Sequence, residues 1–279
     1  MSFFSRVQPA SNESAVIVEV PHSGCVVPDE FAKSLIASRR AIFRDGDPYV
    51  DALFSDAPSE GATLLVAHAS RCIVDLNRSP ADIDSGVVQG APHRTPPRSY
   101  GLIWRHTTDR QPTLERPLSR GEFERRMREI YLPYHRALAE EVEAKKARFG
   151  HTVLIAAHSM PSYDRPIVAP QAAIRSFPKR REDIVLGTLD GASSGADWVA
   201  LVEEVFIKNG LKVAHNEPFR GGFTTQKYGN PAAGVHAIQI EISRRLYMDE
   251  ENSQPVDRAF AIVRRVCQDV VARLAARVV

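Results

Sequence analysis

Two short apolar runs, both rich in β-branched residues, end in the same dipeptide, His-Ser. Residues 16–20 lead through Pro21 into His22-Ser23, and residues 152–157 lead directly into His158-Ser159. Runs of this length and composition are typical of buried strands in a parallel sheet. Ligands of such sheets bind beyond the carboxyl ends of the strands, so we expect both imidazoles at one shared edge.

Strand-like runs alternate with helix-like patterns along the rest of the chain. The clearest helix is 119–149, where Ser119 and Glu122 have capping-box spacing and Pro133 should kink or split the helix. The expected strands are 16–20, 63–68, 71–75, 152–157, 184–188, 211–215 and 236–243. The expected helices are 28–38, 47–57, 119–149, 195–209 and 255–277. This order predicts an α/β fold with a mixed, mostly parallel sheet flanked by helices.

The 279 residues contain no repeat and no linker, so a single domain over 1–279 is expected. One long stretch, 79–121, is rich in Pro, Gly and Arg and has no regular pattern. An irregular connection of that length inside a compact domain is typical of a functional lid or of a disordered loop.

Composition excludes several classes of function. With 36 basic and 34 acidic residues the net charge is +2, which gives no support for a nucleic-acid or membrane partner. Three unpaired-looking cysteines indicate a reducing compartment, and Cys25 among them is expected to be a small buried thiol. No signal-peptide pattern and no apolar stretch of ~20 residues is present, so cytoplasm is the default expectation.

The two His-Ser motifs favour a metal site. A catalytic zinc site has three protein ligands and an open position for water, and neutral imidazole is a common ligand. Alternatively, each histidine only caps its strand through backbone hydrogen bonds, but two at equivalent strand ends favour ligation. The protease spacing His-Glu-x-x-His is absent. A carboxylate from the acidic segment 44–51 is therefore expected as the third ligand, with Asp47 preferred and Asp45 and Asp51 as competitors.

A second group of polar residues lies in the segment 71–78. An expected strand ends there in Asn77-Arg78, and Arg71 lies at its start. A planar guanidinium beside an amide suits a carboxylate, because Arg binds it bidentately and Asn adds a neutral donor. A surface ion pair is the alternative.

Glu241 lies within an otherwise apolar, β-forming run, 236–243. Burial there would be costly for a carboxylate unless it is paired or used, and it would raise the pKa towards neutrality, as a general base requires. The alternative is an edge strand with Glu241 facing solvent. The loop around Arg220 and Gly222 could hold an anion or shape a pocket, although turn chemistry alone would explain its glycines.

Taken together, these pieces resemble the N-formylglutamate amidohydrolase family over nearly the whole chain. The resemblance rests on Pro21-His22-Ser23-Gly24, Asp47 with Asp51, Val74-Asp75-Leu76-Asn77-Arg78, Tyr134-His135, Ala157-His158-Ser159-Met160, Leu186-Gly187-Thr188, Gly221-Gly222, Gln239-Ile240-Glu241 and Tyr247-Met248-Asp249-Glu250. The family is similar to zinc exopeptidases and aspartoacylases, which implies a phosphorylase/hydrolase-like fold. Where those relatives have a Glu ligand, this chain has Cys25.

The resemblance implies a metallohydrolase that cleaves the amide bond of an N-acyl amino acid, N-formylglutamate being the example. It implies one divalent metal, with zinc as the preferred ion, that is held by His22 and His158. It also implies Glu241 as the general base. Asn77 and Arg78 would bind the substrate carboxylate, and 79–121 would cover the substrate. Alternatives are a zinc carboxypeptidase or peptidoglycan amidase, a non-catalytic metal- or metabolite-binding protein, and an interaction domain with structural histidines.

Overall fold

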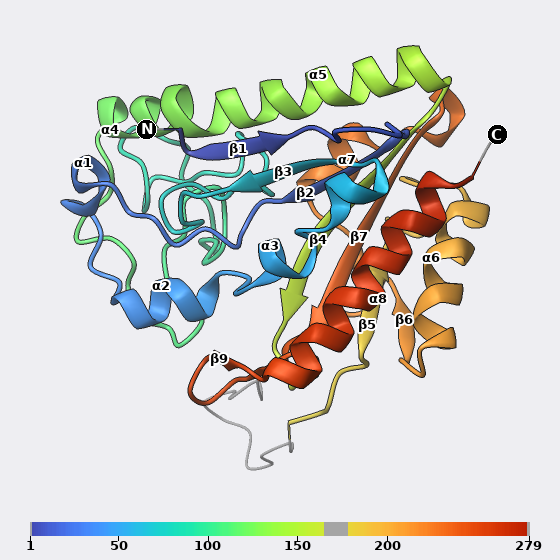
Figure 1. The fold of residues 1–279 in the computed structure, drawn as a ribbon. Helices are drawn as coiled ribbons and strands as arrows, with labels where there is room; N and C mark the ends of the chain where they lie inside the picture. Colours follow the sequence, from blue (N-terminus) through green and yellow to red (C-terminus); the bar gives the residue numbers. More distant parts are fainter. Residues whose placement is uncertain (1, 165–177, 278–279) are drawn as a thin grey trace.

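A seven-stranded sheet forms the centre of the molecule (Figure 1). The computed structural model describes residues 2–164 and 178–277. The strand order is β1-β3-β2-β4-β7-β5-β6, and β8 and β9 form a separate two-stranded ribbon. The strands are β1 (Phe4–Val7), β2 (Val16–Val20), β3 (Thr63–Ala67), β4 (Thr152–Met160), β5 (Ile184–Gly187), β6 (Val213–His215), β7 (Val235–Ser243), β8 (Met248–Asp249) and β9 (Gln254–Pro255).

The sheet is mixed and mostly parallel, which confirms the predicted fold class. The pairs β2–β3, β2–β4, β4–β7 and β5–β6 are parallel, whereas β1–β3 and β5–β7 are antiparallel. The central strands β2, β4 and β7 therefore end at the same edge. That edge is where an open sheet of this kind binds its ligands.

Helices cover both faces of the sheet. The long helix α5 lies along one face, and α6 and α8 lie along the other (Figure 1). The α-helices are α1 (Asp29–Ala32), α2 (Arg39–Asp45), α3 (Val50–Leu53), α4 (Arg120–Arg126), α5 (Leu132–Phe149), α6 (Ala196–Lys208), α7 (Phe223–Tyr228) and α8 (Asp257–Ala275). Short 3₁₀ turns occupy Ala57–Glu60, Pro231–Ala233 and Arg244–Leu246. In the described part of the chain, no helix has the length and apolar character needed to cross a bilayer.

The predicted helix 119–149 is present, but it changes character near Pro133. Ser119 accepts from the Glu122 amide and Glu122 accepts from the Ser119 amide, so the expected capping box closes the start of α4. A π-helical turn, Met127–Tyr131, joins α4 to α5. Proline has no amide proton to donate to the preceding turn, and widening that turn accommodates the missing bond.

Three local predictions were wrong. The segment 71–75 is a turn rather than a strand, because Asp75 Oδ1 accepts from the Asn77 amide at 2.9 Å, and such local bonds compete with a sheet ladder. Residues 28–38 hold only the four-residue α1, since Ser38 caps a new helix, α2. Cys25 is exposed rather than buried.

The stretch 79–121 has little regular structure up to α4, yet it is packed. Val87, Val88, Leu102 and Ile103 are each 2% exposed or less and belong to the same hydrophobic cluster as α5. Isolated bridges, such as that between Val88 and Leu118, and ion pairs, such as that between Arg98 and Asp82, connect it internally. The irregular segment is therefore part of the core on the α5 side of the sheet.

Candidate metal centre and its cavity

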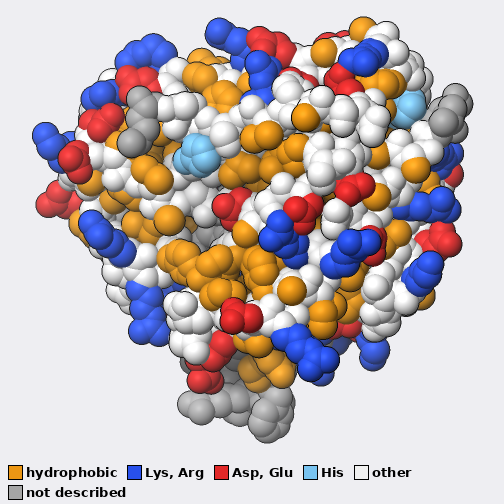
Figure 2. All heavy atoms as spheres, in the orientation of Figure 1, with side chains coloured by type: hydrophobic (Ala, Val, Ile, Leu, Met, Phe, Trp, Pro, Cys, Tyr) orange, Lys and Arg blue, Asp and Glu red, His pale blue; other side chains and the backbone are white. Residues whose placement is uncertain are grey.

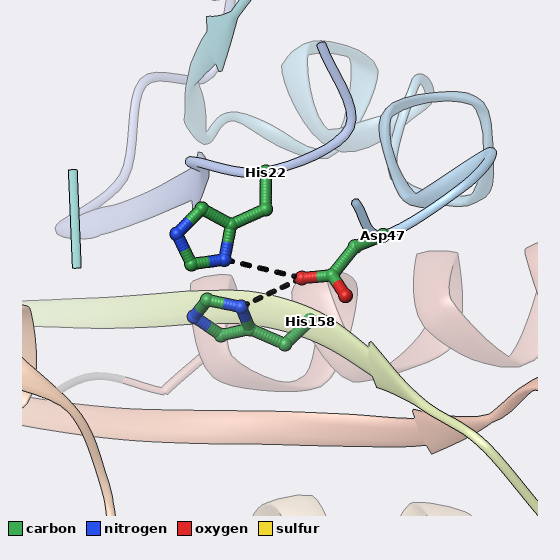
Figure 3. A group of neighbouring side chains, drawn as sticks. All are labelled: His22, Asp47 and His158. Carbon is green, nitrogen blue, oxygen red and sulfur yellow. Dashed lines mark hydrogen bonds and ion pairs between the residues drawn. The ribbon is translucent and has the colours of Figure 1, made fainter. Parts of the chain in front are cut away.

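Three buried side chains from separate segments converge at the carboxyl ends of β2 and β4. His22 follows β2, Asp47 follows α2, and His158 lies in the last third of β4. One potential ligand atom from each of the three lies within 4.8 Å of the others. Both imidazoles turn their Nδ1 atoms towards the Asp47 carboxylate (Figure 3). This arrangement has the ligand number and type of a catalytic zinc site.

Asp47 lies where two imidazoles reach it, whereas its sequence competitors do not. Its Oδ2 is 2.9 Å from His158 Nδ1 and 3.4 Å from His22 Nδ1. Asp45 instead accepts from Arg44 and Thr108, and Asp51 is exposed. Burial by itself would raise the pKa of Asp47, but the two histidines hold it well below its ordinary value. Asp47 is thus an anion at the centre of the group.

His22 has a nitrogen lone pair that no other described residue uses. Its Nε2 donates to Asp75 Oδ1 at 2.7 Å, so a neutral ring has no proton on Nδ1. That Nδ1 is buried, has no hydrogen-bond partner among the described residues, and faces the Asp47 carboxylate. Two acceptors that face each other in a buried site are stabilised by a cation between them. The donor set and this orphaned atom fit a divalent metal.

Asp75 is the centre of a charged group behind His22, which we name the Asp75 cluster: Arg71, Asp75, Trp104 and His22. Asp75 Oδ2 accepts from Arg71 Nη2 at 2.7 Å and from Trp104 Nε1 at 2.9 Å. Burial by itself would raise the pKa of Asp75, but Arg71 and His22 hold it well below the ordinary range. A carboxylate behind a ligating histidine fixes the ring's tautomer and raises its basicity.

A second, mostly neutral group supports His158. We name it the Asn77 cluster: Asn77, His158, Thr224, Gln239 and Glu241. Asn77 Nδ2 lies 3.1 Å from His158 Nε2 and 3.3 Å from Gln239 Oε1, while Asn77 Oδ1 accepts from the Thr224 amide at 2.9 Å. Gln239 Nε2 in turn donates to Glu241 Oε1 at 2.8 Å. The chain of amides runs from the metal group to Glu241.

Gly222 is required by the close approach of Asn77. A Cβ at this position would overlap the Asn77 amide, so only glycine fits. The glycine precedes α7, whose first turn contributes the Thr224 amide that Asn77 Oδ1 accepts. The helix α7 was not predicted from the sequence, because Gly221-Gly222 indicated a loop.

Hydrogen bonds from α5 and from the π-helical turn before it fix the backbone of the segment that contains Asn77 and Arg78. His135 Nε2 lies 3.0 Å from the Leu76 carbonyl, and the Tyr131 hydroxyl donates to the Arg78 carbonyl at 2.8 Å. Burial lowers the pKa of His135 to about 3, so it acts as a neutral donor. Within the motif Tyr134-His135, His135 therefore contributes to the site by fixing the backbone at Leu76, whereas the Tyr134 hydroxyl donates to Glu19.

Glu241 lies beside the metal group in the interior of the sheet. In the β4–β7 register it is the partner of His158, and neighbouring strands are about 4.8 Å apart. It is 6% exposed, and burial raises its pKa to about 7. The alternative of a solvent-facing edge strand is wrong, because β7 is paired on both sides by β4 and β5.

A cavity of about 780 Å³ joins the metal group to these residues. All the predicted site residues contribute to its wall: His22, Asp47, Arg71, Asn77, Arg78, His158, Arg220, Gly222 and Glu241. Tyr100, Trp104 and Thr108 of the irregular segment also line it. Arg220 is exposed and pairs with Asp190 at the rim. The face shown in Figure 2 has basic and acidic side chains interspersed around hydrophobic ones near its centre.

Comparisons with known proteins agree with this site. The model of the N-formylglutamate amidohydrolase family matches residues 14–248. The chain is 32% identical to an N-formylglutamate deformylase of Pseudomonas aeruginosa over 266 residues, 92% of each protein. It is 29% identical to an N-formylglutamate deformylase of Pseudomonas putida, over 84% of this chain and 82% of that one.

A solved structure is also similar over its full length. The crystal structure of N-formylglutamate amidohydrolase from Ralstonia eutropha JMP134 is 33% identical to this chain, with a TM-score of 0.88. The alignment covers 100% of this chain and 99% of that one.

Proposed function

The chain belongs to the N-formylglutamate amidohydrolase family. On that premise we propose that it hydrolyses N-formylglutamate to formate and glutamate. We propose that the reaction uses one divalent metal, with zinc as the preferred ion. The observation that carries the proposal is the buried His22–Asp47–His158 group, which shares one cavity with Glu241 and Arg78. A metal site, a proton acceptor and a carboxylate-binding cation are the three parts that this reaction needs.

We assign the metal to His22 Nδ1, Asp47 and His158. A divalent metal in such a site polarises a carbonyl and lowers the pKa of a water molecule towards ~7. His158 has its Nδ1 directed at Asp47 and its Nε2 at the Asn77 amide. Because Asn77 Oδ1 accepts from the Thr224 amide, Nδ2 is the atom that donates to His158 Nε2, and the neutral ring then has its proton on Nδ1, towards Asp47. Asn77 thus controls the tautomer of the second histidine.

Glu241 is proposed as the group that moves the proton. Its Oε1 accepts from Gln239, and among the described residues no hydrogen bond to Oε2 is recorded. Oε2 can therefore accept a proton from the attacking water and return it to the departing amine. A pKa of about 7 suits both directions of transfer near neutral pH.

Arg78 is proposed to bind a carboxylate of the substrate. Its guanidinium lines the cavity, its Nε is buried without a hydrogen-bond partner among the described residues, and its backbone carbonyl is fixed by Tyr131. Asn77 was expected to share this task. All of its amide contacts are with protein groups, which favours positioning of His158 over contact with substrate. Arg71 is similarly engaged by Asp75.

The test is metal content measured beside turnover. Purified protein should contain about one divalent ion per chain and release formate from N-formylglutamate. His22→Ala and His158→Ala should lose both the metal and the activity, whereas the exposed His215→Ala should keep both. Protein that stays metal-free when supplied with zinc and still releases formate would overturn the metal assignment. Metal-loaded protein that leaves N-formylglutamate intact would overturn the assignment of N-formylglutamate as the substrate.

A further inference from the structure

Among the described residues, six arginines line the cavity, and four of them already have a carboxylate partner. Arg44 pairs with Asp45 and Asp109, Arg71 with Asp75, Arg220 with Asp190, and Arg244 with Asp47. Arg78 and Arg181 have no ion pair among the described residues. The described part of the cavity wall therefore presents two arginines that have no carboxylate within ion-pair distance.

Arg181 enters the cavity from a part of the chain far from Arg78. It lies in the connection between β4 and β5, whereas Arg78 follows β3. Its Nη1 donates to the Pro161 carbonyl at 2.8 Å, and its guanidinium lies 5.4 Å from the centre of the Phe219 ring. The Nε is buried without a hydrogen-bond partner in the described part of the chain. The side chain is held in place, but its donors are not all used.

The charges around Arg181 leave room for an anion. Asp164, Glu241 and Glu250 attract the Arg181 guanidinium electrostatically, but none of them lies within 4.0 Å of it. Glu250 accepts instead from the Ser162 amide. Residues 165–177, outside the described residues, contain no Asp or Glu, so no carboxylate can come from that segment. Burial lowers the pKa of Arg181 in spite of these three carboxylates.

We propose that Arg181 binds the side-chain carboxylate of the substrate, while Arg78 binds the α-carboxylate. This inference rests on the proposed function. Two unpaired cations that open into one cavity match the two carboxylates of an N-acyl dicarboxylic amino acid, and each pair offsets the desolvation of its arginine. The site then selects glutamate derivatives by their second negative charge rather than by size alone.

The experiment compares three substrates in two variants of the metal-loaded enzyme. N-formyl-L-glutamine lacks the side-chain charge, and the α-amide of N-formyl-L-glutamate lacks the α-charge. Arg181→Gln should lower kcat/KM for N-formyl-L-glutamate by ~10- to 100-fold and change N-formyl-L-glutamine by less than ~3-fold. Arg78→Gln should also lower kcat/KM for N-formyl-L-glutamate, but it should leave kcat/KM for the α-amide nearly unchanged. The preference of the enzyme for N-formyl-L-glutamate over the α-amide should therefore decrease. The exposed neighbour Arg180→Gln should leave all three values unchanged.

The outcomes separate the two proposals. If the wild-type enzyme hydrolyses none of the three substrates, the proposed function fails. If it hydrolyses N-formyl-L-glutamate but Arg181→Gln keeps the wild-type ratio between glutamate and glutamine derivatives, only the Arg181 inference fails. A parallel loss on both derivatives would also overturn it, because Arg181 would then act on the reacting amide or on the fold.

Discussion

The two histidines that we propose as metal ligands are supported in opposite ways. His22 is held by the Asp75 cluster, in which a buried carboxylate accepts from an imidazole, a guanidinium and an indole. His158 is held by the Asn77 cluster, in which neutral amides lead to Glu241. The comparison shows how one site can fix a ligand on one side and leave a proton acceptor on the other.

The chemical reason lies in what a nearby charge does to a carboxylate. Arg71 compensates Asp75 at 2.7 Å, so Asp75 stays ionised in the interior. Among the described residues, Glu241 accepts only from the Gln239 amide, and burial raises its pKa to about 7. An arginine in place of Gln239 would abolish that difference.

The largest effect is expected from the end of the Asn77 cluster. Glu241→Gln should reduce turnover by ~10²- to 10⁴-fold, because the amide cannot accept the proton from water. Metal content should not change, since Glu241 is not in the ligand group. Formate release and metal analysis measure the two effects, with the exposed Glu182→Gln as a control. Near-full turnover in Glu241→Gln would refute the role.

The Asp75 cluster should be the stronger support of the metal. Asp75→Asn should weaken metal affinity by ~10- to 100-fold, because the His22 ring loses an anionic acceptor and Arg71 loses its counter-charge. Competition with a chelator of known affinity measures this. An unchanged affinity would mean that Asp75 serves only the packing of the loop.

The Asn77 cluster should contribute less to metal affinity, because its contact with His158 is neutral. Asn77→Ala is expected to weaken the metal by up to ~10-fold. Gly222→Ala should act in the same direction, because the added methyl group displaces the Asn77 amide. Gly121→Ala, at a position with open space, is the matched control. A change in KM with no change in metal affinity would mean that Asn77 contacts the substrate rather than positioning His158.

The last prediction concerns stability and pH in the metal-free protein. The pKa of Glu241 rises from its ordinary value of 4.5 to about 7 in the fold, so the folded state binds the proton more tightly. The stabilisation is fully present below pH 4.5 and is lost as pH rises through 7. Glu241→Gln should therefore match wild type at low pH and exceed it by up to ~3 kcal/mol above pH 7.

Thermal unfolding of both proteins across this pH range, with a chelator present, measures the difference. A gap between the two melting temperatures that stays constant with pH would contradict the raised pKa. At ~2–4 °C per kcal/mol for a domain of similar size, the expected gap is measurable.

Patterns local in the sequence predicted most of the fold. Alternation of strands and helices gave the mixed, mostly parallel sheet, and the capping box at Ser119 is present as expected. The strand-end positions of His22 and His158 and the apolar run around Glu241 singled out three residues that the structure brings to one cavity. Failures occurred where a side chain bonds its own backbone, as Asp75 does in a segment expected to be a strand.

What the sequence by itself determined is therefore the set of residues that bear chemistry and the strands that present them. It preferred Asp47 but left Asp45 and Asp51 as competitors, and it gave Asp75, Gln239 and Arg181 no role in the site. Those choices depend on contacts between residues far apart in the chain, such as His22 with Asp75. Periodicity and capping act over a few residues, whereas burial, charge compensation and the pKa of Glu241 exist only once the segments have met in the tertiary structure.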